Sequence, residues 1–178
     1  MDDIIVIDDF LDDSELNTVN GLLNPFHRDW GLQKSDEHSN ENIFLVRDLI
    51  NIPFFKEELL KKIAKTLDIE DNTPVQCYLN AQWPHRDGDP HQDSCDKTVI
   101  IYPFRSKPHW GGFTQFISPN NPEDQLVIPP LMGRLVCFPG HVLHKGYAYS
   151  NQNNPLRQSI VYKFGRRNYS NVLYPDFA

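Results

Sequence analysis

The hydrophobic residues of this chain repeat with a helical period in its first part and with a strand period later on. After Pro53, apolar residues recur at steps of four, which places them on one face of a helix: Phe55, Leu59, Ile63 and Leu67. We therefore predict a helix that begins at Pro53 and packs this stripe in the core. Residues 11–15 carry N-cap side chains and predict an earlier helix that reaches about Leu23.

From residue 75 onward the apolar residues alternate with polar ones. A period of two predicts a strand here, with Val75, Cys77, Leu79 and Ala81 alternating with Gln76, Tyr78, Asn80 and Gln82. Clusters of Pro, Gly and Asn separate further predicted strands, at residues 98–104, 112–118, 126–128, 134–138 and 157–164. Upstream, residues 4–7 predict a short buried strand, and residues 43–46 predict another within the polar, irregular segment 25–51.

Many short strands separated by such turns are typical of an all-β sandwich or barrel. We predict a mostly β fold, a double-stranded β-helix (jelly roll) core packed against N-terminal helices. With 178 residues the chain has the size of a single domain. That domain would consist of an N-terminal helical support in residues 1–73 and the jelly-roll core in residues 74–165.

Charge and cysteine content narrow the function classes. The net charge of −7 argues against a broad binding surface for nucleic acid or an anionic membrane. The three cysteines are widely spaced and odd in number, so they suggest no disulfide framework; Cys77 and Cys137 are predicted to be buried thiols. The acidic N-terminus does not resemble a secretory signal, and no apolar run approaches the ~20 residues of a membrane span. We expect a cytoplasmic protein.

Histidine and aspartate supply the candidate chemistry. Two histidines and one carboxylate, with open positions left over, form the facial triad that holds non-haem Fe(II) for oxygen chemistry. In an extended segment, residues i and i+2 point the same way, so a His-x-Asp sequence can deliver two ligands to one metal. Three such sequences occur here: His27-Arg28-Asp29, His85-Arg86-Asp87 and His91-Gln92-Asp93.

The residues around each His-x-Asp sequence indicate which of the three can supply metal ligands. The first lies in the polar front segment, before any run of strands, and is predicted to be on the surface. Proline and glycine around His85 and Asp87 indicate a turning loop, whereas His91 and Asp93 lie nearer the next strand. The geometry of an extended backbone thus favours His91 and Asp93, and leaves the other pair open.

The third ligand also has two candidates. His141 follows a Pro-Gly turn, which is typical of a surface position or of a residue that only supports the ligands. His144 follows the apolar pair Val142-Leu143, which indicates that the chain has returned to the interior. The pattern favours His144 over His141.

A longer series of motifs runs through the predicted core. In chain order these motifs are Asn80-Ala81-Gln82, Gly88, His91-Gln92-Asp93-Ser94, Val99-Ile100-Ile101-Tyr102, Trp110-Gly111-Gly112, Gly133-Arg134-Leu135-Val136-Cys137-Phe138, His144 and Arg157-Gln158-Ser159. Over roughly residues 74–165 the chain resembles the Fe(II)/2-oxoglutarate-dependent dioxygenases, and among them the prolyl 4-hydroxylase-like group. The series is far more specific than the triad alone, and its register selects His91, Asp93 and His144 as catalytic metal ligands.

The resemblance implies Fe(II), 2-oxoglutarate as cosubstrate, O2 and possible stimulation by ascorbate. Arg157 would pair with the far carboxylate of 2-oxoglutarate, a role suited to a planar guanidinium with paired donors. Tyr102 matches a tyrosine that donates to the same carboxylate in relatives, and Tyr78 occupies a comparable place on the preceding strand. Ser159 shares a face with Arg157 and could add a hydroxyl. Each of these last three also has an ordinary structural role as an alternative.

The implied reaction is hydroxylation of an unactivated C–H bond with release of succinate and CO2. A prolyl residue in a peptide or protein is the expected substrate. The alternatives are a free amino acid or other small molecule, and a jelly-roll metal-binding or sensing protein without turnover. Nucleic-acid demethylases of this superfamily carry a second arginine six positions beyond the anchor, where this chain has Lys163. We therefore expect neither a nucleic-acid nor a membrane partner, and the sequence predicts no oligomeric state.

Overall fold

The computed structural model describes residues 3–23, 30–34, 43–69, 73–118, 121 and 123–165. Its elements follow one another as β1 (Ile5–Ile7), α1 (Asp13–Leu22), β2 (Gly31–Lys34), β3 (Ile43–Asp48), η1 (Phe54–Leu59), α2 (Leu60–Leu67), β4 (Pro74–Gln82), β5 (Lys97–Ile101), η2 (Pro108–Trp110), β6 (Thr114–Ile117), β7 (Gln125–Ile128), β8 (Leu135–Pro139), β9 (His144–Gly146) and β10 (Arg157–Phe164). The strands predicted from the period of two are all present, with ends shifted by a few residues. The sequence did not predict β2 or β9.

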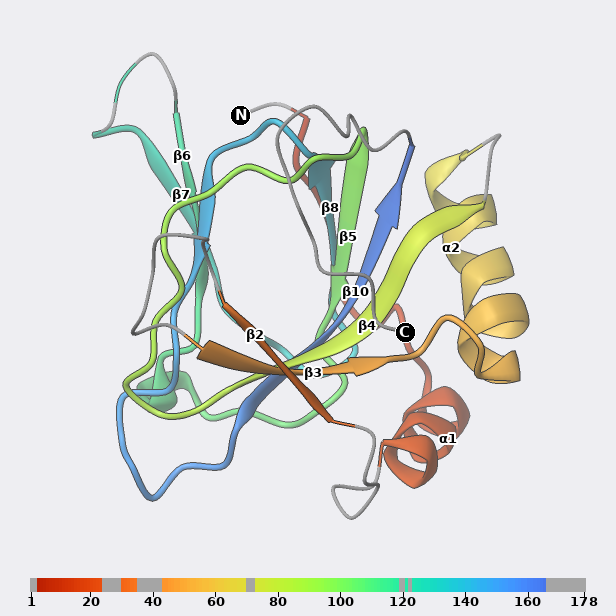
Figure 1. Cartoon of the computed structure of the whole chain (residues 1–178), viewed down its shortest axis with the longest axis horizontal. Helices are drawn as coiled ribbons and strands as arrows, with labels where there is room; N and C mark the ends of the chain where they lie inside the picture. The colour runs from red at the N-terminus through yellow and green to blue at the C-terminus, as the bar shows by residue number, and fades with distance from the viewer. Residues whose placement is uncertain are drawn as a thin grey trace.

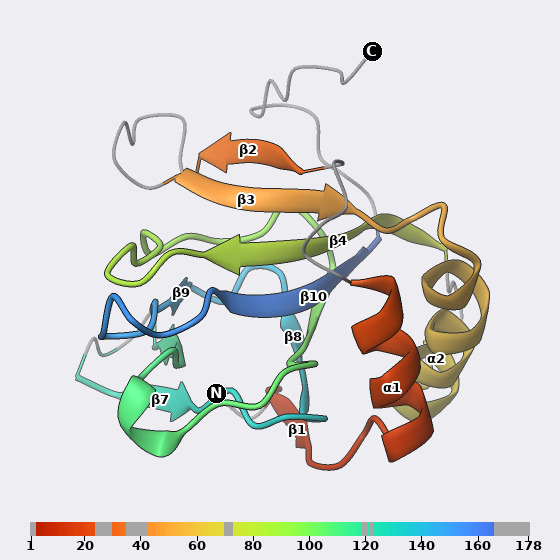
Figure 2. The same ribbon diagram turned by 90° about the horizontal axis from the view of Figure 1, so that it is seen from below.

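The described strands form two antiparallel sheets. The larger sheet has the order β1-β8-β5-β10-β4-β3-β2, and the smaller has the order β7-β6-β9. In Figure 1, α1 and α2 lie on one side of the larger sheet, and β6 and β7 lie on the other. Figure 2 shows the two helices side by side at one end of the layered strands. The larger sheet is therefore covered by helices on one face and by the smaller sheet on the other.

The alternation of residues in β4 and β10 assigns one side-chain set to each face. Cys77, Leu79, Ile160 and Tyr162 belong to the core cluster that also contains helix residues such as Phe55. The opposite face of the same sheet contributes to a second core cluster, in which Phe116 and Ile128 come from the smaller sheet. The buried members of this cluster are Ile100, Tyr102, Phe116, Ile128, Val136, Phe138 and Val161. By the same pleat, every second residue of β10 from Arg157 to Lys163 faces the smaller sheet.

Specific polar contacts fix the ends and the position of the helices. At the start of α1, Asp12 accepts a bond from the backbone of Glu15, and the Glu15 side chain accepts one from the backbone of Asp12, each at 2.8 Å. This capping box satisfies N–H groups that the first turn leaves without partners. The predicted second helix opens with a π-helical turn, η1, whose Phe55 carbonyl accepts a 2.7 Å bond from Tyr162 in β10.

One predicted strand has a different environment from the one expected. Residues 4–7 were expected to form a buried strand, but β1 lies at the edge of the larger sheet and pairs only with β8 among the described strands. Ile5 and Val6 are 45% and 41% exposed. A short apolar run carries no signal of which strand neighbours it, so it cannot separate an edge strand from a central one. The prediction of burial was therefore wrong for this segment.

Two further predictions concern burial and membrane insertion. Cys77 and Cys137 are buried free thiols, as predicted, and Cys95 is half-buried. No helix within the described ranges is long and apolar enough to cross a membrane.

Candidate metal centre

The segment between β4 and His91 runs alongside β9 and the residues that follow it. His91 and His144 exchange two backbone hydrogen bonds of 2.9 Å, and the N–H of Gly88 donates to the carbonyl of Gly146 at 2.8 Å. Farther along, the N–H of His85 donates to the carbonyl of Tyr149 at 2.9 Å. This extended pairing adds a strand-like segment to the smaller sheet. It places His91 beside His144 although the two lie far apart in the sequence.

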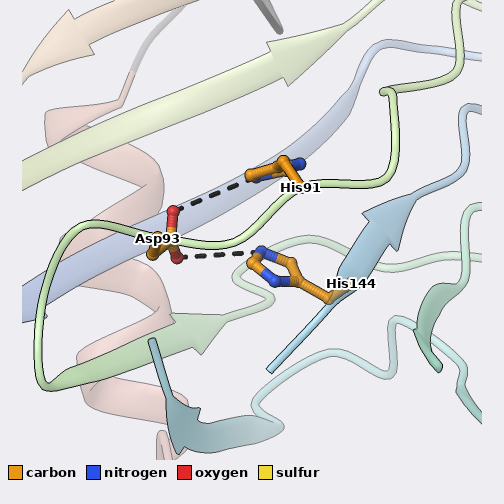
Figure 3. A group of neighbouring side chains, drawn as sticks. All are labelled: His91, Asp93 and His144. Atoms are coloured by element: carbon orange, nitrogen blue, oxygen red, sulfur yellow. Dashed lines mark ion pairs between the residues drawn. The ribbon is translucent and has the colours of Figure 1, made fainter. Parts of the chain in front are cut away.

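Three side chains converge at this point. The candidate ligand atoms of His91, Asp93 and His144 all lie within 4.8 Å of one another. Nε2 of His91 lies 3.9 Å from Oδ1 of Asp93, and Nε2 of His144 lies 3.7 Å from Oδ2. Figure 3 shows the Asp93 carboxylate facing both imidazole rings. No other group of three or more such residues comes together in the part of the chain that the structure describes.

Both histidines are held in the tautomer that a metal ligand requires. Nδ1 of His91 lies 2.8 Å from the carbonyl of Asp89, and Nδ1 of His144 lies 2.9 Å from the carbonyl of Val142. Because a carbonyl oxygen only accepts, Nδ1 must carry the proton in each bond, which leaves the Nε2 lone pair available. Burial lowers the pKa of His144 to about 4, against the opposing effect of the Asp93 carboxylate, so the ring is neutral at pH 7.

The Asp93 carboxylate is buried and ionised. Lys163 donates to Oδ1 at 2.6 Å, and the Thr98 hydroxyl donates to Oδ2 at 2.5 Å. Burial by itself raises the pKa of Asp93, but three effects lower it to about 2: the charge of Lys163, the charge that His144 carries below its own pKa of about 4, and these two hydrogen bonds. Two imidazoles and one carboxylate are a donor set that suits a divalent transition metal such as Fe(II). The residues present thus fit the metal that the sequence suggested.

The alternative ligands have other positions and partners. Asp87 accepts a 2.9 Å bond from the backbone of Ala148, and its other oxygen lies 3.7 Å from Nζ of Lys145. These contacts hold the loop against the segment after β9, so Asp87 has a structural role there.

His141 is exposed, and its carbonyl accepts a 2.5 Å bond from Gln92. His27 and Asp29 lie outside the described residues.

Arg157 is a buried cation without an acidic partner among the described residues. Its side chain donates to the carbonyl of Gly112 at 2.8 Å, to Oε1 of Gln82 at 2.7 Å and to the hydroxyl of Thr114 at 2.9 Å. The residue is 3% exposed, and none of the ion pairs formed by the described residues includes it. A buried charge with only neutral partners is costly, so this guanidinium is suited to receive an anion.

The guanidinium lies close to the candidate metal ligands. A Cβ added to Gly146 would lie 3.6 Å from Nη1 of Arg157, and Gly146 is two residues from His144 on the same strand. Two residues of a strand span about 7 Å on one face. Tyr102 lies beneath the guanidinium, and the centroid of its ring is 5.5 Å from Cζ of Arg157. The Tyr102 hydroxyl lies 2.7 Å from the hydroxyl of Thr114. A small dicarboxylate is of the size that reaches from the histidines to Arg157.

Ser159 and Tyr78, the two other predicted binding residues, face the same interior. Ser159 is buried on the Arg157 face of β10 and pairs in register with Asn80. Tyr78 lies under Lys163, whose Nζ is 5.9 Å from the ring centroid. Their proximity to the site agrees with a binding role, which stays a prediction for both.

Sequence reasoning missed several residues that support the site. Lys163 and Thr98 hold Asp93, and Gln82 and Thr114 hold Arg157. For Lys163, the period of two gave a usable signal because it lies six residues from Arg157 and therefore on the same face of the strand. Gln82 belongs to the Asn80-Ala81-Gln82 motif of the sequence, although its contact with Arg157 was not predicted, whereas Thr98 and Thr114 have no such local signal.

Glycine is required at position 140 for the Asp93 segment to approach. A Cβ added there would collide with the carbonyl of Cys95 and come within 2.9 Å of the carbonyl of Asp93. We expect Gly140→Ala to separate these backbones, to cost about 1–3 kcal/mol of stability and to weaken divalent metal binding. Thermal unfolding and Mn(II) titration measure the two effects. The control is Gly21→Ala in α1, where nothing lies within 4 Å of the added Cβ; equal metal affinity in both variants would contradict this expectation.

Comparison with known proteins supports the fold assignment. No family model and no curated protein matches the chain. Among solved structures, a Pseudomonas putida prolyl-4-hydroxylase is similar with a TM-score of 0.67 at 14% identity, covering 92% of this chain and 93% of that one. A prolyl hydroxylase from Trichoplax adhaerens, in complex with a fragment of hypoxia inducible factor, gives 0.69 at 17% identity, with 91% and 83% covered.

A third similar structure contains a different kind of bound molecule. The epimerase SnoN, in complex with Fe3+, alpha ketoglutarate and nogalamycin RO, gives a TM-score of 0.70 at 12% identity, with 91% of this chain and 79% of that one covered. At such low identities the likeness concerns the fold. The predicted jelly roll is confirmed: this chain has the fold of the 2-oxoglutarate- and iron-dependent oxygenases.

Proposed function

We propose that this protein is an Fe(II)- and 2-oxoglutarate-dependent dioxygenase that hydroxylates an unactivated C–H bond. The observation that carries the proposal is the pairing of two features on one interior face. His91, Asp93 and His144 converge as a facial triad, and the buried Arg157 beside them has no acidic partner in the described part of the chain. A metal-binding or sensing protein without turnover needs the first feature but has no use for the second.

Each residue then has a defined role. His91, Asp93 and His144 hold the metal, with Nε2 of each ring directed toward it by the bond at Nδ1. Arg157 binds the far carboxylate of 2-oxoglutarate through the N–H groups that its three neutral partners leave unused, and Tyr102 and Ser159 line the same space. Iron bound there would supply the redox chemistry with O2 that couples decarboxylation of 2-oxoglutarate to hydroxylation.

We propose a prolyl residue in a peptide or protein as the substrate. The side chain of His91 is 38% exposed, whereas those of Asp93 and His144 are 4% and 6% exposed, so the site opens to solvent on the His91 side. Two of the similar structures are prolyl hydroxylases, one of them with a peptide fragment bound. The second candidate is a small-molecule substrate, since SnoN binds nogalamycin RO on the same fold.

The test of the reaction class is succinate formation. We expect purified protein with Fe(II), ascorbate and 2-oxoglutarate to release succinate, and a proline-rich peptide to stimulate the release. Succinate without peptide stimulation, but with stimulation by a free amino acid or other small molecule, would support the second substrate class. Tight metal binding with no succinate and no protection of the fold by 2-oxoglutarate would contradict the proposal.

A further inference from the structure

Asp93 has a cationic partner within the chain. Nζ of Lys163 donates to Oδ1 at 2.6 Å, while the neutral hydroxyl of Thr98 donates to Oδ2. The side chains of Asp93 and Lys163 are 4% and 12% exposed, so solvent screens this pair only weakly. A short charge-assisted bond between buried groups holds the carboxylate in one orientation.

The register of β10 places Lys163 at this position. Lys163 pairs directly with Thr98 of β5, so the two donors to Asp93 lie opposite each other across the ladder. On the neighbouring strand, the ring of Tyr78 lies below the ammonium group at 5.9 Å. An aromatic face stabilises a cation and limits where its side chain can turn. The contact with Asp93 is therefore built into the sheet and does not depend on a mobile surface lysine.

The same carboxylate oxygens face the two candidate histidine ligands. Oδ1, which accepts from Lys163, lies 3.9 Å from Nε2 of His91, and Oδ2 lies 3.7 Å from Nε2 of His144. A divalent ion held by these groups would bind the same carboxylate as the ammonium group of Lys163. The two positive charges would therefore lie close together. Like charges at such a distance repel strongly when they are buried. In the absence of an ion, Lys163 compensates a carboxylate that would otherwise be buried alone.

We propose that Lys163 is a positioning residue that competes with the metal ion for Asp93. It keeps the carboxylate directed at His91 and His144, and it lowers the affinity of the centre for divalent cations so that the bound metal exchanges readily. The inference rests on the metal centre of the proposed function and adds a form of regulation to it, because occupancy then follows the supply of iron. Two effects both lower the affinity for metal: the ammonium group stabilises the site without metal, and it destabilises the site with metal.

The test replaces Lys163 by methionine, which keeps the length of the side chain and removes its charge and its donor. Mn(II) is the probe, in calorimetric titrations without 2-oxoglutarate, and thermal unfolding is followed with and without Mn(II). We expect Lys163→Met to bind Mn(II) more tightly by on the order of ten-fold or more. Its Tm should fall without metal and recover with saturating Mn(II), so that the metal-induced rise in Tm exceeds that of the wild type.

Two further variants separate the charge from other effects. Lys163→Arg keeps a cation and a donor beside Asp93 and should restore the wild-type affinity for Mn(II). Lys97→Met removes an exposed lysine from β5, the strand that pairs with the Lys163 end of β10, and should leave both affinity and Tm shift unchanged. A change of similar size in Lys97→Met would assign the effect to net charge and overturn the inference.

Other results would also overturn it. Mn(II) affinity of Lys163→Met that equals or falls below that of the wild type would show that Lys163 does not compete with the metal. So would a Tm lowered equally with and without Mn(II), which is the mark of a merely structural role. If the variant folds only in the presence of Mn(II), competition is supported; if it fails to fold in both conditions, it is not. A wild-type protein that binds no Mn(II) would instead remove the metal centre on which the inference rests.

Discussion

His144→Ala is expected to abolish both metal binding and succinate formation, whereas His141→Ala leaves both within about twofold of the wild type. His144 is buried, and its Nε2 faces Asp93 at 3.7 Å. Removal of this ligand leaves one histidine and one carboxylate, and the affinity for metal should fall by far more than the roughly 10–100-fold typical of losing a residue that only supports a ligand. Mn(II) titration and the succinate assay measure the two losses.

Two measurements of Tm separate the loss of the ligand in His144→Ala from damage to the core. His144 packs against Phe138, with ring centroids 4.7 Å apart, so alanine also leaves a small cavity. The Tm without metal reports that cost, and the metal-induced rise in Tm reports the ligand. His85→Ala provides a second control. His85 is the histidine of the alternative sequence His85-Arg86-Asp87, in which Asp87 accepts a bond from the backbone of Ala148. Loss of metal in His85→Ala with retention in His144→Ala would make the ligand assignment wrong.

Much of the fold could be predicted from local patterns because each long strand has one face in each core. In β4, alternate residues reach the cluster beneath the helices, and the residues between them face the smaller sheet. A period of two is the direct consequence of that arrangement, so β4 and β10 were predicted close to their observed bounds. The three-residue strand β9 is different: it is too short to show a period, and it is recognised as a strand by its pairing with β6.

The candidate site could be predicted only as far as its chemistry lies in local sequence. His91 and Asp93 are two residues apart, and an extended backbone brings them together without help from the rest of the chain. Their relation to Lys163, Thr98 and His144 depends on the order of strands in two sheets, which no single segment encodes. In the same way, Gln82 and Thr114 are bound to Arg157 from positions 75 and 43 residues away. These contacts follow from topology: the Asn80-Ala81-Gln82 motif marks Gln82, but it does not show that Gln82 binds Arg157.

Arg157→Met is expected to raise the KM for 2-oxoglutarate by on the order of a hundred-fold or more, since it removes the charge-assisted bonds to the far carboxylate. Its effect on stability should be smaller, because two terms oppose each other. The variant removes a buried cation without an acidic partner among the described residues, but it leaves the carbonyl of Gly112 and the side chains of Gln82 and Thr114 with one bond fewer. The Mn(II)-induced rise in Tm should persist, and the further rise on adding 2-oxoglutarate should disappear.

A carboxylate introduced beside the intact arginine should have the same selective effect by a different route. Oε1 of Gln82 lies 2.7 Å from Nη1 of Arg157, so Gln82→Glu would give the guanidinium an internal anion of nearly the same shape. That anion neutralises the charge that attracts 2-oxoglutarate, and the KM should rise although Arg157 is still present. Gln82→Leu removes the hydrogen bond to Nη1 of Arg157 without adding charge and should raise the KM less. If both Arg157→Met and Gln82→Glu leave the KM unchanged while lowering Tm, Arg157 is a structural cation and the cosubstrate is bound elsewhere.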